Sequence, residues 1–180
     1  MIRQIKIGPG ENTPRIDTFK KGGQDMASSG FHTHDHVKCV AEALGALESY
    51  CQTEGLKFTA LRRRVFELLL EEHKAMGAYD ILDRLRTEGF SAQPPVAYRH
   101  LDFLVAHGFA HKIERLNAFI ACTHIGALHD PAFLICRECR TVSETMSDSS
   151  ILALHHRASD ADFQIEESVV EAIGTCPDCR

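Results

Sequence analysis

Two Cys-x-x-Cys motifs in the C-terminal part of the chain constrain its fold more than any other feature. The first is Cys136-Arg-Glu-Cys139, and the second is Cys176-Pro-Asp-Cys179. Together they supply four thiolates, which is the number that closes a tetrahedral structural Zn²⁺ site. A site filled by four sulfur atoms leaves no position for water, so we expect this ion to fold a domain rather than to catalyse a reaction.

Redox-active dithiols are the alternative interpretation of the same motifs. Neither motif lies in the βαβ pattern that is typical of thioredoxin-like proteins. The chain has seven cysteines, an odd number. We find no apolar run near the roughly 18 residues of a membrane span and no apolar core of a secretory signal. The sequence therefore predicts a cytoplasmic protein without a membrane partner, in which metal ligation is favoured over disulfides.

The secondary-structure signals divide the chain into an N-terminal helical part and a C-terminal mixed part. Apolar residues recur at helical spacing in several segments, and two β-rich runs follow the last of them, which predicts a winged helix-turn-helix. The second cysteine motif follows a further alternation of short strands and a helix, so the overall fold class is α+β. The predicted helices are 37–51, a segment capped by Thr59, 78–88, 94–107 and 147–159, and the predicted strands are 109–114, 118–121, 133–136, 141–144 and 163–172.

Four motifs in this order resemble the ferric uptake regulator superfamily, and within it they are most similar to the zinc uptake regulators. They are GAYDILDRLR at 77–86, PPVAYRHLDFLVAHGFAHKIE at 94–114, AFIAC at 118–122 and FLICREC at 133–139. The resemblance implies a homodimeric repressor that binds double-stranded operator DNA of zinc-uptake genes, with about two Zn²⁺ ions per protomer. The chain departs from the family pattern at Val96, Ala97 and His100 in the recognition helix and at Arg140 after the first motif.

Changes in composition and periodicity along the chain set the expected domain boundaries, and the resemblance implies the role of dimerisation for the last part. Residues 1–36 are predicted to be a disordered leader that contains histidines, and 37–122 a winged-helix DNA-binding domain. Residues 123–130 are predicted to be a hinge, and 131–180 a small α/β dimerisation domain with the four-cysteine zinc site.

The resemblance implies a second, regulatory zinc site. Its ligands fall on His111, Cys122, His129 and Glu144. Nitrogen, sulfur, nitrogen and oxygen donors form a four-coordinate set that suits Zn²⁺, and the sulfur favours zinc over iron or manganese. His124 lies in the same loop and is an alternative to His129. Because the ligands come from the wing, the hinge and the second domain, zinc would select one domain orientation and so favour DNA binding by the dimer.

DNA contacts must be argued from local features, because a net charge of −5 does not indicate nucleic-acid binding. We expect Arg99 to recognise guanine, because the two parallel N–H donors of its guanidinium match the acceptors on the guanine edge in the major groove. Tyr98 lies beside it, Arg62 and Arg63 are candidates for phosphate contacts, and Tyr79 resembles a DNA-contacting tyrosine of the family. An ordinary solvated or core-packed helix face is the alternative for each of these residues.

Two further features carry weaker hypotheses. Asp83 and Arg86, three residues apart, either pair within one helix or bridge neighbouring dimers on DNA. His32, His34 and His36, followed by Cys39, form either an accessory metal site or a histidine-rich tail of weak affinity. Met26, which opens MASSGFHTHDH, is an alternative start of translation.

Other functions fit the sequence less well. A regulator of the same fold that responds to another metal or to peroxide is the nearest alternative, and Cys122 distinguishes it from a zinc sensor. A redox switch would oxidise Cys122 or the Cys-x-x-Cys motifs and release zinc. A zinc hydrolase would need an open metal position and a general base, and the chain has no HExxH motif. We therefore predict no enzymatic activity and no small organic substrate.

Overall fold

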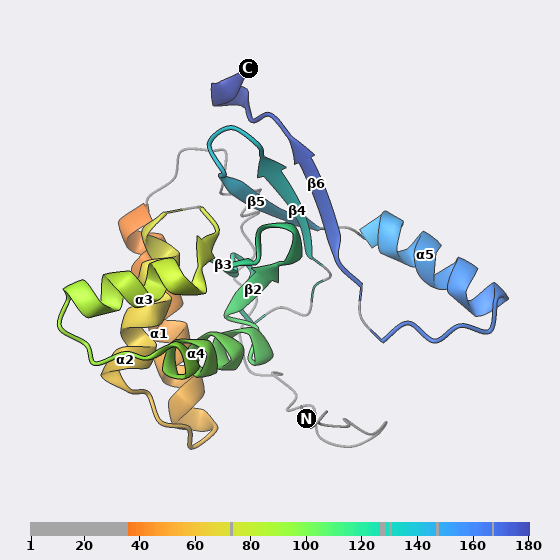
Figure 1. The fold of residues 1–180 in the computed structure, drawn as a ribbon. Coiled ribbons are helices and arrows are strands. Elements are labelled where there is room, and N and C mark those ends of the chain that lie inside the picture. The colour runs from red at the N-terminus through yellow and green to blue at the C-terminus, as the bar shows by residue number, and fades with distance from the viewer. Residues whose placement is uncertain (1–35, 73, 127–128, 130, 147, 167) are drawn as a thin grey trace.

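The computed structural model describes residues 36–180 except 73, 127–128, 130, 147 and 167 (Figure 1). The predicted leader therefore lies outside the described residues except for His36, which begins the first helix. Within the described ranges, no helix combines the length and the apolar character that a membrane span requires. The elements are α1 (His36–Thr53), α2 (Ala60–Glu71), β1 (Met76–Gly77), α3 (Ala78–Thr87), α4 (Pro94–Ala106), β2 (Ala110–Ile113), η2 (Glu114–Leu116), β3 (Ala118–Ala121), β4 (Pro131–Cys136), β5 (Val142–Met146), α5 (Asp148–Asp160), β6 (Val170–Gly174) and η3 (Pro177–Cys179).

Helices α1 to α4 pack around the larger apolar core and confirm the predicted helical segments (Figure 1). Thr59 caps α2, since its side chain accepts a hydrogen bond of 3.1 Å from the backbone N–H of Arg62. Pro94 occupies the first turn of α4, where its missing N–H costs nothing. The centre of this core consists of fully buried side chains from all four helices, among them Leu47, Phe66, Leu82, Leu101 and Leu104.

The wing is an antiparallel hairpin of β2 and β3, in which His111 pairs with Ile120. Strand β1 pairs with the other edge of β3, so the order of this sheet is β1-β3-β2. The sequence did not predict β1, because two residues are too short to show an alternating pattern. The hairpin itself is confirmed.

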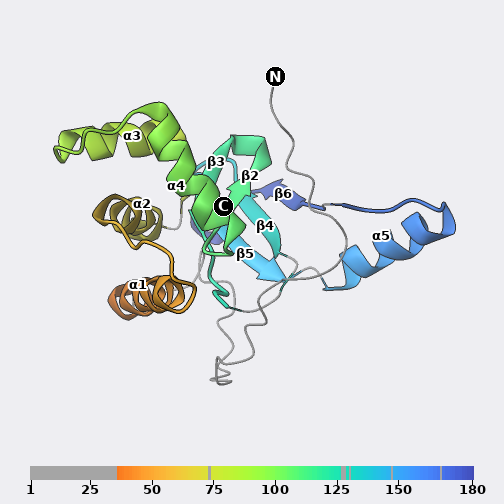
Figure 2. The same ribbon diagram turned by 90° about the horizontal axis from the view of Figure 1, so that it is seen from below.

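The second sheet has the order β5-β4-β6, with β4 antiparallel to β5 and parallel to β6. The strand predicted at 163–172 is misplaced, because β6 spans Val170–Gly174. Its position follows from pairing with β4, in register from Ala132↔Val170 to Cys136↔Gly174. This register brings the end of β6 beside the first cysteine motif. Helix α5 projects away from both sheets (Figure 2).

A small second apolar core joins the wing to the second sheet. Ile113 and Ile120 of the wing pack against Phe133, Ile135 and Val142. An isolated β-bridge between residues 74 and 141 adds a backbone contact between the two parts of the chain. The wing is therefore shared between the helical part and the C-terminal part.

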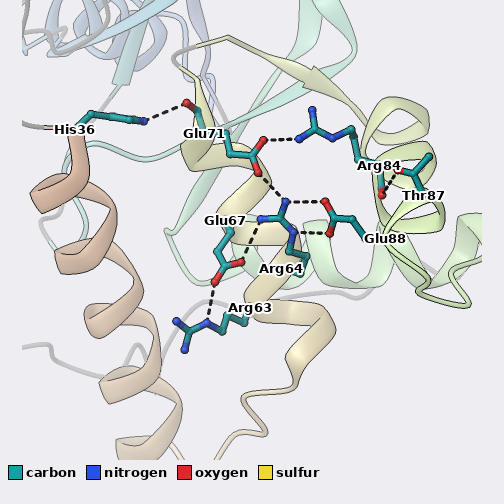
Figure 3. A network of polar contacts seen from close by, with 8 residues as sticks. All are labelled: His36, Arg63, Arg64, Glu67, Glu71, Arg84, Thr87 and Glu88. Carbon is teal, nitrogen blue, oxygen red and sulfur yellow. Dashed lines mark hydrogen bonds and ion pairs between the residues drawn. The ribbon is translucent and has the colours of Figure 1, made fainter.

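Arg64 is the centre of an ion-pair network that joins α2 to the end of α3 (Figure 3). Its guanidinium lies 2.6 Å from Glu88, 2.7 Å from Glu71 and 3.2 Å from Glu67. Arg84 also contacts Glu71, at 2.8 Å. The hydrogen bond from Arg64 lowers the pKa of Glu88, which follows the last residue of α3. A network of several partly buried charges holds its members better than isolated surface pairs do, so it fixes α2 relative to the turn before α4.

Arg140, at the position where the resemblance predicts glycine, lies in the turn after the first cysteine motif. Arg140 adopts a φ of 59°, in the left-handed region that favours glycine. Its N–H donates to the carbonyl of Cys136 at 3.0 Å, and the N–H of Cys136 donates to the carbonyl of Thr141 at 2.9 Å. The departure therefore costs about 1–2 kcal/mol of local strain without opening the turn.

Candidate metal centres and DNA-binding surface

The four cysteines of the two Cys-x-x-Cys motifs come together at one end of the second sheet. Cys136 ends β4, Cys139 lies in the following turn, Cys176 directly precedes η3, and Cys179 is the last residue of η3. The four sulfur atoms lie within 4.8 Å of one another, and Cys139 Sγ is 3.7 Å from Cys176 Sγ. None of the seven cysteines forms a disulfide.

Electrostatics in this cluster favour a bound cation. Backbone N–H groups of Cys139 and Cys176 lower the pKa of Cys136 to about 6. The neighbouring sulfur atoms of Cys176 and Cys139 raise the pKa of Cys179 to about 12. Thiolates held so close together repel one another unless a metal ion neutralises them, and four thiolates in this arrangement fit Zn²⁺.

A second cluster lies where the wing meets the second sheet. His111 is on β2, Cys122 follows β3, His129 lies in the connecting loop and Glu144 is on β5. Their ligand atoms all lie within 4.8 Å of one another. Glu144 Oε1 is 2.7 Å from His129 Nε2, 3.3 Å from His111 Nε2 and 3.9 Å from Cys122 Sγ.

Charges in the second cluster are strongly coupled. Burial alone would raise the pKa of Glu144, but the close imidazoles of His111 and His129 hold it far below its usual range. The same contacts outweigh the burial of His111 and raise its pKa to about 9. Burial would also raise the pKa of Cys122, yet His111 and His129 lower it. The cluster therefore stabilises the anionic forms of a thiol and a carboxyl between two imidazoles.

The residues present fit a zinc ion. His111 Nε2 is buried and forms no hydrogen bond of acceptable geometry within the described part of the chain, although it lies 3.3 Å from Glu144. Buried polar nitrogens normally have a partner, and a metal at the centre of the cluster would supply one. Two nitrogens, a sulfur and an oxygen make a donor set that Zn²⁺ accepts.

His124 lies beside this cluster but is not one of the four residues whose ligand atoms meet. Its Nδ1 is 3.3 Å from Glu144 Oε1 and 3.0 Å from Thr123 Oγ1. Its backbone N–H donates to Cys122 Sγ at 3.3 Å. The geometry therefore favours His129 over His124 as the second imidazole.

Thr123 is a contributor that the sequence analysis missed. Its backbone N–H and its hydroxyl both donate to Glu144 Oε2, at 2.8 and 2.9 Å. Glu144 Oε1 consequently remains directed at the other three donors. Such outer contacts orient a metal ligand. A hydroxyl next to a strand-ending cysteine was the only signal available, and it is too common to identify this role.

The candidate DNA-reading residues are distributed over α3 and α4. Tyr79 is 65% exposed at the start of α3, and Arg99 is exposed on α4. Tyr98 is half-buried against the helical core. Ala97 and His100 are buried, so these two departures from the family pattern face the protein interior rather than a DNA groove.

The two arginines predicted to contact phosphates have protein partners. The guanidinium of Arg62 lies 3.4 Å from the ring centroid of Phe103 on α4, and it also donates to the carbonyl of Lys57. Arg63 forms an ion pair of 2.8 Å with Glu67 but remains exposed. Arg62 is thus held against the fold, whereas Arg63 is accessible from solvent.

The structure describes only some of the residues on which the two weaker hypotheses depend. Asp83 and Arg86 pair within α3 at 3.4 Å and both are exposed. His36 Nε2 lies 3.1 Å from the carbonyl of Glu71. His32, His34 and Met26 lie outside the described residues, so the accessory site and the alternative start stay predictions.

Comparisons with known proteins agree on one family. The sequence model of the Ferric uptake regulator family matches residues 53–173. The chain is 35% identical over 140 residues to the zinc uptake regulation protein of Escherichia coli strain K12, covering 77% of this chain and 81% of that protein. A solved structure of a zinc uptake regulator with zinc and DNA has a TM-score of 0.73 at 34% identity, and covers 78% of this chain and 94% of that one. The crystal structure of holo XcZur has a TM-score of 0.69 at 37% identity, and covers 77% and 96%.

Proposed function

The chain belongs to the ferric uptake regulator family, and from this premise we propose that it is a zinc-responsive, DNA-binding transcriptional repressor. The observation that carries the proposal is the cluster of His111, Cys122, His129 and Glu144. Its sulfur and nitrogen donors suit Zn²⁺ better than iron or manganese. The relatives named above are zinc uptake regulators, and one of them was solved with zinc and DNA.

Two zinc ions per protomer have different tasks in this proposal. The four cysteines of the Cys-x-x-Cys motifs hold the structural ion. The second ion supplies a Lewis-acidic centre that binds two imidazoles, a thiolate and a carboxylate at once. We further propose that 37–122 is the DNA-binding domain, 123–130 the hinge and 131–180 the dimerisation domain.

This chain's own residues explain how zinc affects DNA binding. The wing carries His111 on β2 and presents Cys122 directly after β3. Glu144 is fixed on the second sheet, with one carboxylate oxygen held by Thr123. Bringing all four donors together selects one orientation of the wing relative to the second sheet. A typical allosteric coupling of about 1–3 kcal/mol per site would raise DNA affinity roughly 5- to 150-fold.

A homodimer is consistent with the exposed surface of the C-terminal part. Apolar side chains that are 42–61% exposed lie on α5, β4, β6 and the segment just before β6. Apolar patches of this kind commonly mark an interface, and a two-fold dimer presents two reading helices to two half-sites. The residues are Leu134, Leu152, Leu154, Val169 and Ile173.

The alternatives have less support. A regulator of the same family that senses another metal or peroxide would not need the Cys122 thiolate in its sensor cluster. A zinc hydrolase would need an open coordination position, but each cluster supplies four donors. We therefore propose no enzymatic activity and no small organic substrate for this chain.

DNA binding measured against buffered free zinc tests the proposed function. Fluorescence anisotropy with operator-containing DNA should show affinity rising with free Zn²⁺ in the dimer. Mn²⁺ and Fe²⁺ in matched buffers should produce a much weaker response. Equal DNA affinity with and without zinc, or a stronger response to iron or manganese, would reject a zinc-responsive repressor.

Arg99→Ala is expected to weaken operator binding and to relax sequence preference. Loss of one guanine contact costs about 1–3 kcal/mol per half-site. Competition assays with operator and unrelated DNA would measure the loss of discrimination at saturating zinc. Arg157→Ala is the matched control, because Arg157 is an exposed arginine in the last turn of α5, outside both metal clusters and outside α3 and α4. Unchanged discrimination in the Arg99 variant would remove this residue from the base contacts.

A further inference from the structure

A glutamate of the second sheet is bonded to the tip of the wing. Glu171 lies on β6, and η2 forms the turn between the two wing strands. Glu171 Oε1 accepts a hydrogen bond of 2.6 Å from the backbone N–H of Glu114, and Oε2 accepts one of 3.1 Å from that of Arg115. Both carboxylate oxygens thus accept hydrogen bonds from one short segment of the wing.

The chemistry of this contact makes it stronger than an ordinary surface hydrogen bond. N–H groups at the start of a helical turn have no partner within the turn. A carboxylate that accepts from both forms charge-assisted bonds, which are shorter and stronger than neutral ones. The side chain of Glu114 does not compete for the site, because it pairs with Lys112 at 2.8 Å.

The contact lies at the opposite end of the wing from the sensor cluster. His111 precedes Glu114 by three residues on β2, which corresponds to about 10 Å along a strand. The sensor ligands therefore hold the base of the hairpin, and Glu171 holds its tip. Between them, Ile113 and Ile120 pack against Phe133 of the second sheet. Two separate attachments along a hairpin define its orientation, whereas one attachment leaves rotation about that point.

We propose that Glu171 is a positioning residue that fixes the wing in the orientation competent for DNA binding, through a contact that contains no metal. This inference rests on the proposed function and adds a second determinant to it. Glu171 increases the fraction of molecules whose sensor ligands are already assembled. The free zinc needed for half-maximal DNA binding depends on that fraction.

The test compares Glu171→Ala and Glu171→Gln with wild type as full-length dimers. Glu171→Ala removes both acceptors, and Glu171→Gln keeps one neutral acceptor. At saturating zinc, we expect Glu171→Ala to weaken DNA binding about tenfold and to shift the zinc midpoint upward, because bonds to charged groups are the stronger ones. The DNA affinity and the zinc midpoint of Glu171→Gln should fall between those of wild type and Glu171→Ala. Zinc content and dimerisation should match wild type. Glu166→Ala is the control, an exposed glutamate before β6.

Amide hydrogen exchange separates positioning from general stability. Glu171→Ala should accelerate exchange in the wing tip, residues 113–117, and leave the helical core unchanged. Wild-type exchange in the tip together with a wild-type zinc midpoint would overturn the proposal. A uniform loss of protection across the molecule would also overturn it, because that is the signature of a purely structural role. If DNA binding by the wild-type protein did not depend on zinc, the proposed function would fail. Amide hydrogen exchange in the wing tip of Glu171→Ala would still decide whether Glu171 holds the wing.

Discussion

A Cys122→Ser variant is expected to keep its fold and its dimer and to lose its DNA response to zinc. The Cys122 thiol is buried, and its contacts with His111 and His129 lower its pKa, so it is poised to act as a thiolate ligand. Serine has nearly the same shape but is a poor zinc ligand at neutral pH. The zinc-dependent gain in DNA affinity, roughly 5- to 150-fold per site, should therefore disappear.

The measurement is DNA binding over a range of buffered free zinc, with metal content determined on the same samples. The variant should bind about one zinc ion per protomer, because the four-cysteine site is intact. Cys51→Ala is the matched control, since Cys51 is a buried cysteine in the helical core. A Cys122→Ser protein that still required zinc for tight DNA binding would remove this residue from the sensor site.

Replacing a cysteine of the other cluster is expected to have a different and larger effect. Cys176→Ser removes one of four sulfur donors at the junction of β4 and the C-terminal turn. Binding of structural zinc contributes about 10–16 kcal/mol in small zinc-binding domains, which exceeds the stability of most domains. We therefore expect the β5-β4-β6 sheet to lose its ordered structure, the dimer to dissociate and DNA binding to fail at every zinc concentration.

Analytical ultracentrifugation, circular dichroism and metal content would measure these three losses together. Pro177→Ala is the matched control, because Pro177 lies between the two ligands, is exposed and donates no metal ligand. The two cysteine variants are thus distinguishable: Cys122→Ser gives a folded dimer without a response, and Cys176→Ser gives an unfolded C-terminal part. A folded, dimeric Cys176→Ser protein would show that this cluster is not required for the fold.

Local patterns predicted the helical part and most of the strands. Helical spacing of apolar residues, the Thr59 cap and Pro94 placed α1 to α4 with small errors at their ends. Local patterns failed for β1, which is too short to show a period, and for β6, which was expected too early. The position of β6 is set by its parallel pairing with β4, a long-range contact that leaves no alternating signature along the strand.

The contacts of individual polar residues were harder to predict than which cysteine, histidine and glutamate side chains lie together. Arg62 stacks on Phe103, an interaction that the sequence did not predict, and its phosphate contact stays a prediction. Thr123 and Glu171 carried no signal, although one orients Glu144 and the other holds the wing tip. Each of these contacts joins residues far apart in the chain and depends on how the helices and strands pack together.

The sequence by itself determined the kinds of chemistry available to this protein: four thiolates in two Cys-x-x-Cys motifs, and a mixed nitrogen, sulfur and oxygen set that suits zinc. These are properties of residue types and short spacings, which survive in any conformation of the chain. Only the tertiary structure decided that His129 rather than His124 meets the other ligands, and that the wing is held at both ends. Such choices depend on distances of a few ångströms between segments that are joined only when the sheets pair and the two cores pack.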